Sequence, residues 1–225
     1  MPAPRKFSQE QLRDAALAIV DEQGLDALTM RALAARLGTG AMTIYNYVDG
    51  RDGLDALVTA AVLGAAPAPG GSDRPDAPVD WRDEVRAVGT ALWRAIRAHP
   101  NAIPLLLTRR TLDEATLDQA EALLGALRRA GFGGFGLLTA FRAVSGFVTG
   151  FAQAELAGPL SAARGDGFDT VLARARALPA ERYAGLREIA EASAAAEPGA
   201  EFRAALDLVL AGLSATLADK IPDSP

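Results

Sequence analysis

Cysteine is absent from the 225 residues, histidine occurs once, and aromatic residues make up 6% of the chain. A chain without cysteine forms no disulfide and offers no thiolate ligand to zinc. With one histidine and no cysteine, a small hydrolase would have almost no groups from which to build a nucleophile and its base. We therefore expect no enzyme activity, no bound metal and no cofactor.

Long apolar runs are missing as well. No stretch approaches the ~18 uninterrupted apolar residues of a membrane span. The first residues, MPAPRKFSQEQ, lack the apolar core of a signal peptide. We expect a cytoplasmic protein with no membrane partner.

Strand-forming patterns are scarce, because Ala and Leu dominate and β-branched residues are comparatively few. Apolar residues recur at helical spacing instead, which predicts an all-α fold. Ser8 and Gln11 form a candidate capping box for a first helix that Gly24 ends. The helices predicted after it cover residues 29–37, 40–47, 51–63, 81–99, 113–130, 134–157, 180–196 and 201–219.

The pattern divides the chain into a small head and a larger body. Residues 1–50 are predicted to form a three-helix head, and residues 51–63 a connecting helix. Residues 64–80, GAAPAPGGSDRPDAPVD, hold four prolines and three glycines and predict a flexible linker. Residues 81–225 are predicted to form a helical body, with a Gly-rich loop within 158–179.

The formal net charge of −5 is distributed unevenly. Residues 1–51 hold six basic and six acidic side chains, so the net negative charge belongs to the rest of the chain. A neutral head on an acidic body indicates that only the head meets a polyanion.

The stretch LGTGAMTIYNYVDGR, residues 37–51, is the most informative in the chain. Between Gly38 and Val48 it carries no charged side chain, yet it holds two tyrosines, two threonines and an asparagine. A helix over 29–37, a tight turn and a short helix would form a helix-turn-helix, whose second helix enters the DNA major groove. The predicted core of this head consists of Ile19, Leu28, Leu33, Leu37, Ile44 and Val48.

The side chains left outside that core are of the types that read DNA. Asparagine can make a bidentate contact to adenine, threonine and methionine can meet a thymine methyl, and tyrosine can bond a phosphate oxygen. Positive charge flanks them at Arg31, Arg36 and Arg51. The residues predicted to contact DNA are Thr29, Arg31, Thr39, Ala41, Met42, Thr43, Tyr45, Asn46, Tyr47 and Arg51.

Residues 29–58, TMRALAARLGTGAMTIYNYVDGRDGLDALV, resemble the DNA-binding head of the TetR-type repressors. That pattern is a T-x-R-x-[LI]-A-x-x-L-G run, then a short helix ending in L-Y-x-[HY]-[FV], then a basic residue. The positions that match it are Thr29, Arg31, Leu33, Ala34, Leu37, Gly38, Ile44, Tyr45, Tyr47 and Val48.

The body resembles the tetracycline-repressor branch of the same family. The similar stretches are HPNAIPLLLTRR, EALLGALRRAGF and GFVTGFAQAEL, and the final EFRAALDLVLAGLSATL is similar to the dimerisation helix of that branch. The resemblance implies a homodimer whose two heads bind adjacent major grooves of a palindromic double-stranded DNA operator. It also implies a small-molecule effector that binds the body and releases the DNA.

One departure concerns the metal-bound drug of the tetracycline repressors. They hold drug-chelated magnesium through a histidine in the segment matching residues 104–108, where this chain has three leucines, and Ser145-Gly146-Phe147 stands at their glycine-flanked histidine. We therefore expect an apolar or aromatic effector in place of magnesium–tetracycline. The candidate pocket residues are Trp93, His99, Leu106, Phe135, Phe141, Phe147, Phe151 and Glu155.

Several of these residues have alternative interpretations. His99 precedes Pro100 and ends its helix, so its imidazole is either a helix cap, favoured by the helix dipole, or an effector contact. The stripe from Phe135 to Phe151 fits core, dimer interface or pocket lining, and Glu155 fits pocket or dimer seam. The last helix carries a stripe broader than a surface helix needs, which predicts a dimer interface at Phe202, Leu206, Val209, Leu210, Leu213 and Leu217.

The hexapeptide GFGGFG, residues 131–136, matches G-x-G-x-x-G, but a dinucleotide-binding fingerprint requires a strand before it. The preceding LLGALRRA is helical in pattern, so we interpret the glycines as a connection between helices.

The favoured function is a ligand-responsive repressor. The alternative from another class is a helical adaptor that binds protein through the same head without reading DNA.

Overall fold

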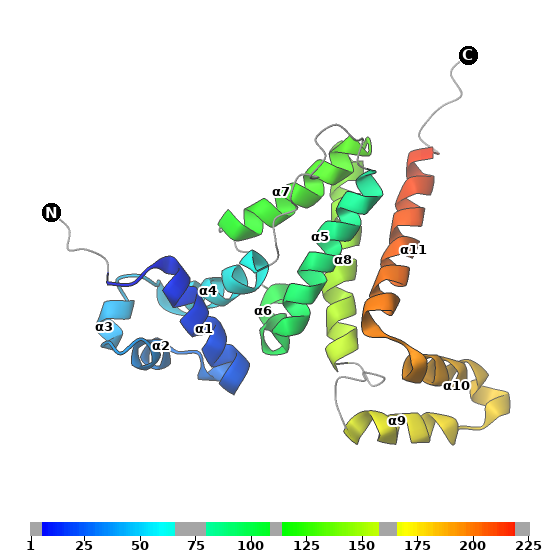
Figure 1. The fold of residues 1–225 in the computed structure, drawn as a ribbon, viewed down its shortest axis with the longest axis horizontal. Coiled ribbons are helices and arrows are strands. Elements are labelled where there is room, and N and C mark those ends of the chain that lie inside the picture. The colour runs from blue at the N-terminus through cyan, green and yellow to red at the C-terminus, as the bar shows by residue number, and fades with distance from the viewer. Residues whose placement is uncertain (1–5, 66–79, 109–113, 158–165, 219–225) are drawn as a thin grey trace, which may run out of the picture. The chain divides into compact units, whose positions relative to one another are not determined.

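The computed structural model describes residues 6–65, 80–108, 114–157 and 166–218, and all regular structure within these ranges is helical (Figure 1). The all-α prediction is therefore confirmed. The first residues of the chain and most of the predicted linker, residues 66–79, lie outside the described ranges.

The N-terminal helices follow the predicted order. They are α1 (Gln9–Gln23), the 3-10 turn η1 (Leu25–Ala27), α2 (Met30–Arg36), α3 (Ala41–Ile44) and α4 (Gly50–Gly64). The capping box at the start of α1 is present, because the Gln11 N–H donates to Ser8 Oγ at 3.1 Å and the Ser8 N–H donates to Gln11 Oε1 at 2.9 Å. The third helix is shorter than the predicted 40–47, since Asn46 and Tyr47 donate to carbonyls three residues back and continue it as turns.

The C-terminal helices begin close to their predicted positions. They are α5 (Trp81–Ala98), η2 (Pro100–Ala102), α6 (Ile103–Thr108), α7 (Glu114–Arg129), α8 (Gly134–Ala157), α9 (Asp166–Arg176), α10 (Ala180–Ala195) and α11 (Pro198–Ala218). Two of these α-helices, and the 3-10 turn η2, were not predicted. The loop expected within 158–179 contains α9, and the short α6 follows Pro100 with a second proline, Pro104, in its first turn, where proline is tolerated.

The chain forms two compact units. The first comprises residues 1–79 and 91–125, and the second comprises residues 80–90 and 126–225. In the first unit, α1 packs on α2 and α4, and α2 packs on α3. The side chains that fill this packing include Leu12, Ile19, Leu28, Leu33, Ile44 and Val58, all fully buried.

In the second unit α8 and α11 lie side by side (Figure 1). Phe202 of α11 is fully buried between two rings of α8, with ring centroids 5.7 Å from Phe147 and 5.4 Å from Phe151. Gly89 of α5 lies against the same pair, because a methyl group there would come within 3.3 Å of Leu206 and 3.6 Å of Val148. The glycine thus allows α5 to approach both helices closely.

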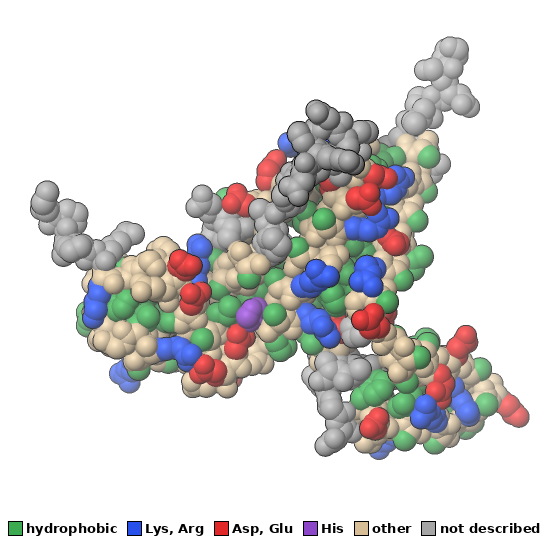
Figure 2. Space-filling view, viewed as in Figure 1, with side chains coloured by type: hydrophobic (Ala, Val, Ile, Leu, Met, Phe, Trp, Pro, Cys, Tyr) green, Lys and Arg blue, Asp and Glu red, His purple; other side chains and the backbone are tan. Residues whose placement is uncertain are grey.

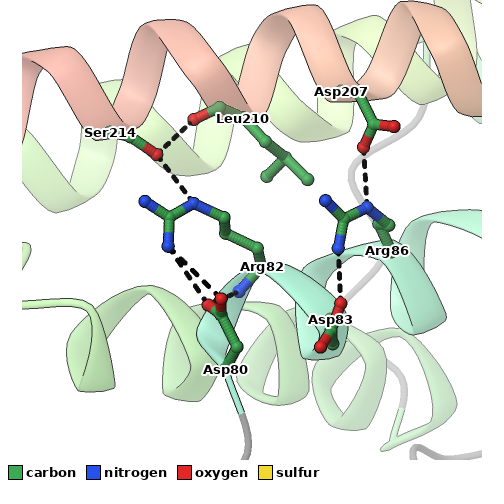
Figure 3. A network of polar contacts seen from close by, with 7 residues as sticks. All are labelled: Asp80, Arg82, Asp83, Arg86, Asp207, Leu210 and Ser214. Carbon is green, nitrogen blue, oxygen red and sulfur yellow. Dashed lines mark hydrogen bonds and ion pairs between the residues drawn. The ribbon is translucent and has the colours of Figure 1, made fainter.

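Polar contacts reinforce the attachment of α5 to α11 (Figure 3). Arg82 Nε donates to Ser214 Oγ at 3.0 Å, and Arg86 Nε donates to Asp207 Oδ1 at 2.6 Å. The hydrogen bond to Asp207 raises the pKa of Arg86 above its ordinary value. These contacts fix the first two turns of α5 on the C-terminal helix.

The connection between α7 and α8 confirms the interpretation of GFGGFG. Gly131 and Gly134 have φ of 99° and 52°, which glycine adopts readily, and they join two helices with no strand before them. Phe132 anchors the connection, because it is buried and its ring meets Trp81 edge-on at 6.3 Å.

Candidate functional site

The turn between α2 and α3 has a defined hydrogen-bond pattern. The Gly38 N–H donates to Ala35 O at 3.1 Å, and the Thr39 N–H donates to Ala34 O at 2.9 Å. Gly38 has φ of 62°, so this is a Schellman turn with glycine at its left-handed position. At the other end of α2, Thr29 Oγ1 caps the helix by accepting from the Ala32 N–H at 3.1 Å. These local contacts build the predicted helix-turn-helix.

Residues 41–47, which we name the reading segment, point most of their polar side chains outward. Ile44 faces the core and is fully buried, whereas Met42 is 78% exposed and Tyr45 is 55% exposed. Asn46 is exposed, and Ala41, Thr43 and Tyr47 are half-buried. The reading segment thus offers an amide, hydroxyls and a thioether to a partner, with no charged group among them.

Tyr47 has a partner within the head. Its hydroxyl accepts hydrogen bonds from the backbone N–H groups of Lys6, at 2.7 Å, and Phe7, at 3.3 Å. Its ring also meets Phe7 edge-on, with centroids 6.1 Å apart. Tyr47 therefore holds residues 6 and 7 beside the reading segment, a role that was not predicted. Its hydroxyl group can still donate one hydrogen bond to a partner such as DNA.

The three predicted flanking arginines differ in their surroundings. Arg36 binds Glu22 through two nitrogens, at 2.7 and 2.6 Å. The hydrogen bond from Arg36 lowers the pKa of Glu22, and the same bond raises the pKa of Arg36. Arg51 is bound to two backbone carbonyls and to Asp55. Arg31 is exposed and makes no hydrogen bond or ion pair with the described residues, so of the three it is the one available to an external anion.

In the first unit the candidate pocket residues are Trp93, His99 and Leu106. Trp93 is buried, and the Arg97 guanidinium lies 5.5 Å from the centre of its ring. His99 Nδ1 lies 2.8 Å from Asp21 Oδ2 of α1, so the imidazole contacts the head, an interaction that neither interpretation of His99 predicted. Leu106 is half-buried.

The remaining candidates belong to the second unit. Phe141, Phe147, Phe151 and Glu155 are half-buried on α8, and two of the rings form the aromatic cluster with Phe202. Phe135 does not fit the prediction, because it is 82% exposed at the beginning of α8 and cannot line a pocket within one chain.

The predicted dimer interface on α11 requires a larger correction. Phe202, Leu206 and Leu210 are almost wholly buried within the chain, and Leu213 is nearly so, so the interface prediction for them is wrong. Their stripe faces the core of the subunit. Val209 and Leu217 are half-buried. The exposed side of α11 carries Leu208, 77% exposed, which the stripe prediction omitted.

Helix α8 is unusual for its combination of low polarity and low burial. Residues 134–156 are long and apolar enough to cross a membrane, yet only 22% of the best window is buried. Small residues, Ala143, Gly146 and Gly150, are exposed on it. Hydrophobic side chains also follow the edge that α11 forms (Figure 2). Both helices therefore expose apolar surface that one chain leaves uncovered.

Within the described residues, no group of three or more His, Asp or Glu side chains is arranged to hold a metal ion.

Comparison with known proteins defines the family. Residues 12–55 match the family described as "Bacterial regulatory proteins, tetR family", and residues 74–217 match "Tetracyclin repressor-like, C-terminal domain". The chain belongs to the TetR family.

Relatives support this assignment. An HTH-type transcriptional regulator of Saccharopolyspora erythraea is 34% identical over 149 residues, 66% of this chain and 61% of that protein. The HTH-type transcriptional repressor DrrR1 of Streptomyces coeruleorubidus is 31% identical over 147 residues, 65% of this chain and 53% of that protein. The matched stretch therefore spans less than two thirds of either relative. TetR-family proteins of this kind are transcriptional regulators, not enzymes.

Solved structures of the family superpose on almost the whole length of the chain. Apo ActR from Streptomyces coelicolor superposes with a TM-score of 0.79 at 27% identity, covering 97% of this chain and all of that one. ActR in complex with actinorhodin superposes with a TM-score of 0.76 at 28% identity, covering 96% of this chain and 99% of that one. The resemblance inferred from the sequence is confirmed for both the head and the body.

Proposed function

We propose that this TetR-family chain is a ligand-responsive repressor that binds a palindromic DNA operator as a homodimer. In this proposal residues 1–50 form the DNA-binding head, 51–63 the connecting helix, 64–80 a linker, and 81–225 the effector-binding and dimerisation body. The protein acts in the cytoplasm, where its DNA target lies.

The observation that carries the proposal is the reading segment on its helix-turn-helix. Its exposed side chains have hydrogen-bonding and methyl groups without charge, which suits the edges of bases in a major groove. Thr29, Thr39 and Arg31 lie at the two ends of α2, where phosphates would pass. Met42, Thr43 and Asn46 are proposed to read bases, and Tyr45 to bond a phosphate.

The homodimer is supported by the exposed faces of α8 and α11. Exposed apolar surface on a folded chain commonly marks an interface. Arg142 stands exposed in the middle of α8, and an arginine there would be costly in lipid, so a second copy is a better cover than a membrane. Small residues on α8 allow close approach of another helix. A two-fold dimer would present two heads about one DNA turn apart, roughly 34–36 Å.

The effector is proposed to be apolar or aromatic, and not magnesium–tetracycline. The aromatic cluster of Phe147, Phe151 and Phe202 supports this, because aromatic rings stack favourably on one another in offset and edge-on arrangements. Binding of actinorhodin by the similar ActR is consistent with such a ligand class. Release of DNA requires only that the effector bind one conformation better than the other, with a coupling of about 1–3 kcal/mol.

Selection of a random-sequence DNA library against the purified protein tests the proposal. Salt must be held fixed, because every phosphate contact makes the affinity depend on it. We expect recovery of one palindrome, and weaker binding of that palindrome by Arg31→Ala. The matched control is Arg13→Ala, which removes an arginine of α1 outside the helix-turn-helix. If no motif emerges and only weak, salt-sensitive binding remains, the alternative of a protein-binding adaptor is favoured.

A further inference from the structure

The N-terminal turn of α4 carries a polar contact that DNA binding alone does not explain. Arg51 Nη1 donates to Leu28 O at 2.9 Å, and Nη2 donates to Leu25 O at 3.3 Å. Its Nε lies 2.9 Å from Asp55 Oδ1, one turn further along α4. All three guanidinium nitrogens are therefore engaged within the first unit.

Burial and charge make this arrangement different from an ordinary surface ion pair. The Arg51 side chain is 48% exposed, but that of Asp55 is only 4% exposed. A buried carboxylate requires a close counter-charge, because an unpaired buried charge is strongly unfavourable. Arg51 supplies that charge, so the pair is electrically neutral as a unit and offers little net attraction to a phosphate.

The two carbonyls that Arg51 binds lie at a critical point in the chain. Leu25 and Leu28 bound the turn η1, and Leu28 immediately precedes Thr29, the residue that caps α2. Holding these carbonyls fixes where α2 begins. Since α2 carries the Schellman turn into the reading segment, the position of Arg51 affects the orientation of residues that it does not touch.

A second contact attaches the same turn of α4 to the other end of the helix-turn-helix. Gly53 packs so closely on Val48 that a methyl group at Gly53 would lie 2.8 Å from Val48 Cγ1. Val48 is buried directly after the reading segment. The first turn of α4 therefore contacts the helix-turn-helix at both ends. Arg51 binds the carbonyls before α2, and Gly53 packs on Val48 after α3.

We propose that Arg51 is a positioning residue that orients the reading segment on α4, and that it does not contact DNA phosphate. The expected effect on DNA affinity rests on the proposed function, whereas the orientation of the reading segment by Arg51 does not. It replaces the prediction that Arg51 is a DNA contact. Arg31, exposed and without a partner among the described residues, retains the phosphate-binding role.

Salt dependence of binding separates the two roles. Each phosphate interaction contributes about 0.9 to the slope of log K against log salt, and in a dimer one substitution removes an arginine from both heads. The probe is the palindromic duplex recovered by the library selection, with the full-length protein. We expect Arg51→Lys to lower affinity about tenfold at every salt concentration with an unchanged slope, because lysine keeps the charge but cannot bridge two carbonyls and Asp55. Arg31→Ala should lower the slope.

The lysine variant makes the test decisive. If Arg51 bound phosphate, Arg51→Lys would retain affinity and slope, and Arg51→Ala would lower the slope as Arg31→Ala does; either result overturns the proposal. Amide hydrogen exchange, measured without DNA, provides the independent readout. Exchange over residues 25–36 should be faster in Arg51→Lys than in wild type, but unchanged in Arg31→Ala. Equal exchange in the two variants overturns the proposal, whereas a wild type that binds no duplex overturns only the proposed function.

Discussion

The helix-turn-helix head and the α8–α11 pair leave different side chains exposed. In the head, the large hydrophobic side chains that are exposed are Met42 and Tyr45, both on the reading segment. On α8 and α11 the exposed ones are Phe135, Leu138 and Leu208. The head therefore buries its core and exposes a largely polar surface. The α8–α11 pair also buries a core, but it exposes apolar side chains as well.

This difference indicates what each region needs from a partner. A neutral polar surface gains from directional hydrogen bonds, which carry specificity. An exposed apolar surface gains binding free energy when a partner excludes water from it, and this contribution is non-directional. The head is suited to read a sequence, and the helix pair to hold a second copy of the chain.

The largest expected effect comes from breaking the core of the head. Leu33 is fully buried in α2, so Leu33→Ala should destabilise the head by about 2–5 kcal/mol and abolish DNA binding. Thermal unfolding followed by circular dichroism, together with the DNA-binding assay, checks this. Leu186→Ala is the control, because Leu186 is exposed on α10 and its removal should change stability by less than about 0.5 kcal/mol. Similar melting curves for the two variants would show that the core assignment is wrong.

A smaller effect is expected from a charge placed on the apolar surface. Leu208→Arg should leave the folding of each chain intact and weaken the dimer by about 2 kcal/mol or more, roughly thirtyfold in its Kd. Light scattering during size-exclusion chromatography measures the mass as a function of concentration. Gln23→Arg adds the same charge at an exposed position of α1 and should leave the mass unchanged. A dimer that withstands Leu208→Arg would place the interface elsewhere.

The smallest effect is expected at the ion pair between α1 and α2. Arg36 lowers the pKa of Glu22 below its ordinary value of 4.5. A carboxylate with a lowered folded-state pKa stabilises the fold above the unfolded-state pKa, and that contribution is lost as the pH falls through the folded-state value. Glu22→Gln should therefore lower the melting temperature slightly at pH 7, because both side chains are exposed to solvent. The difference from wild type should shrink and then disappear as the pH falls below 4.5. A difference that grew with acidity would contradict the assignment.

Local sequence determined the elements whose signals are contained within a few neighbouring residues. Ser8 and Gln11 specified the beginning of α1, Thr29 capped α2, and Gly38 specified the turn, because capping and left-handed glycine are decided by atoms three to five residues apart. The length and apolar periodicity of α8 gave its bounds, 134–157, without any tertiary information. The helix α9 escaped prediction because it lies between Gly-rich and Pro-containing segments that mask its short apolar pattern.

The tertiary structure decided what each helical face meets. Phe202, Leu206 and Leu210 have the spacing of an interface stripe, but the same spacing serves a core, and only their packing in the subunit separates the two. Arg51 was predicted to contact phosphate because a basic residue at the start of a helix fits both a phosphate contact and a positioning role. Asp55 is one helical turn away, but the carbonyls of Leu25 and Leu28 reach Arg51 only because α4 packs against η1, more than twenty residues earlier in the chain. A sequence thus specifies caps, turns and periodicity through local contacts, whereas the partner of a charged or apolar side chain depends on which distant segment the fold brings against it.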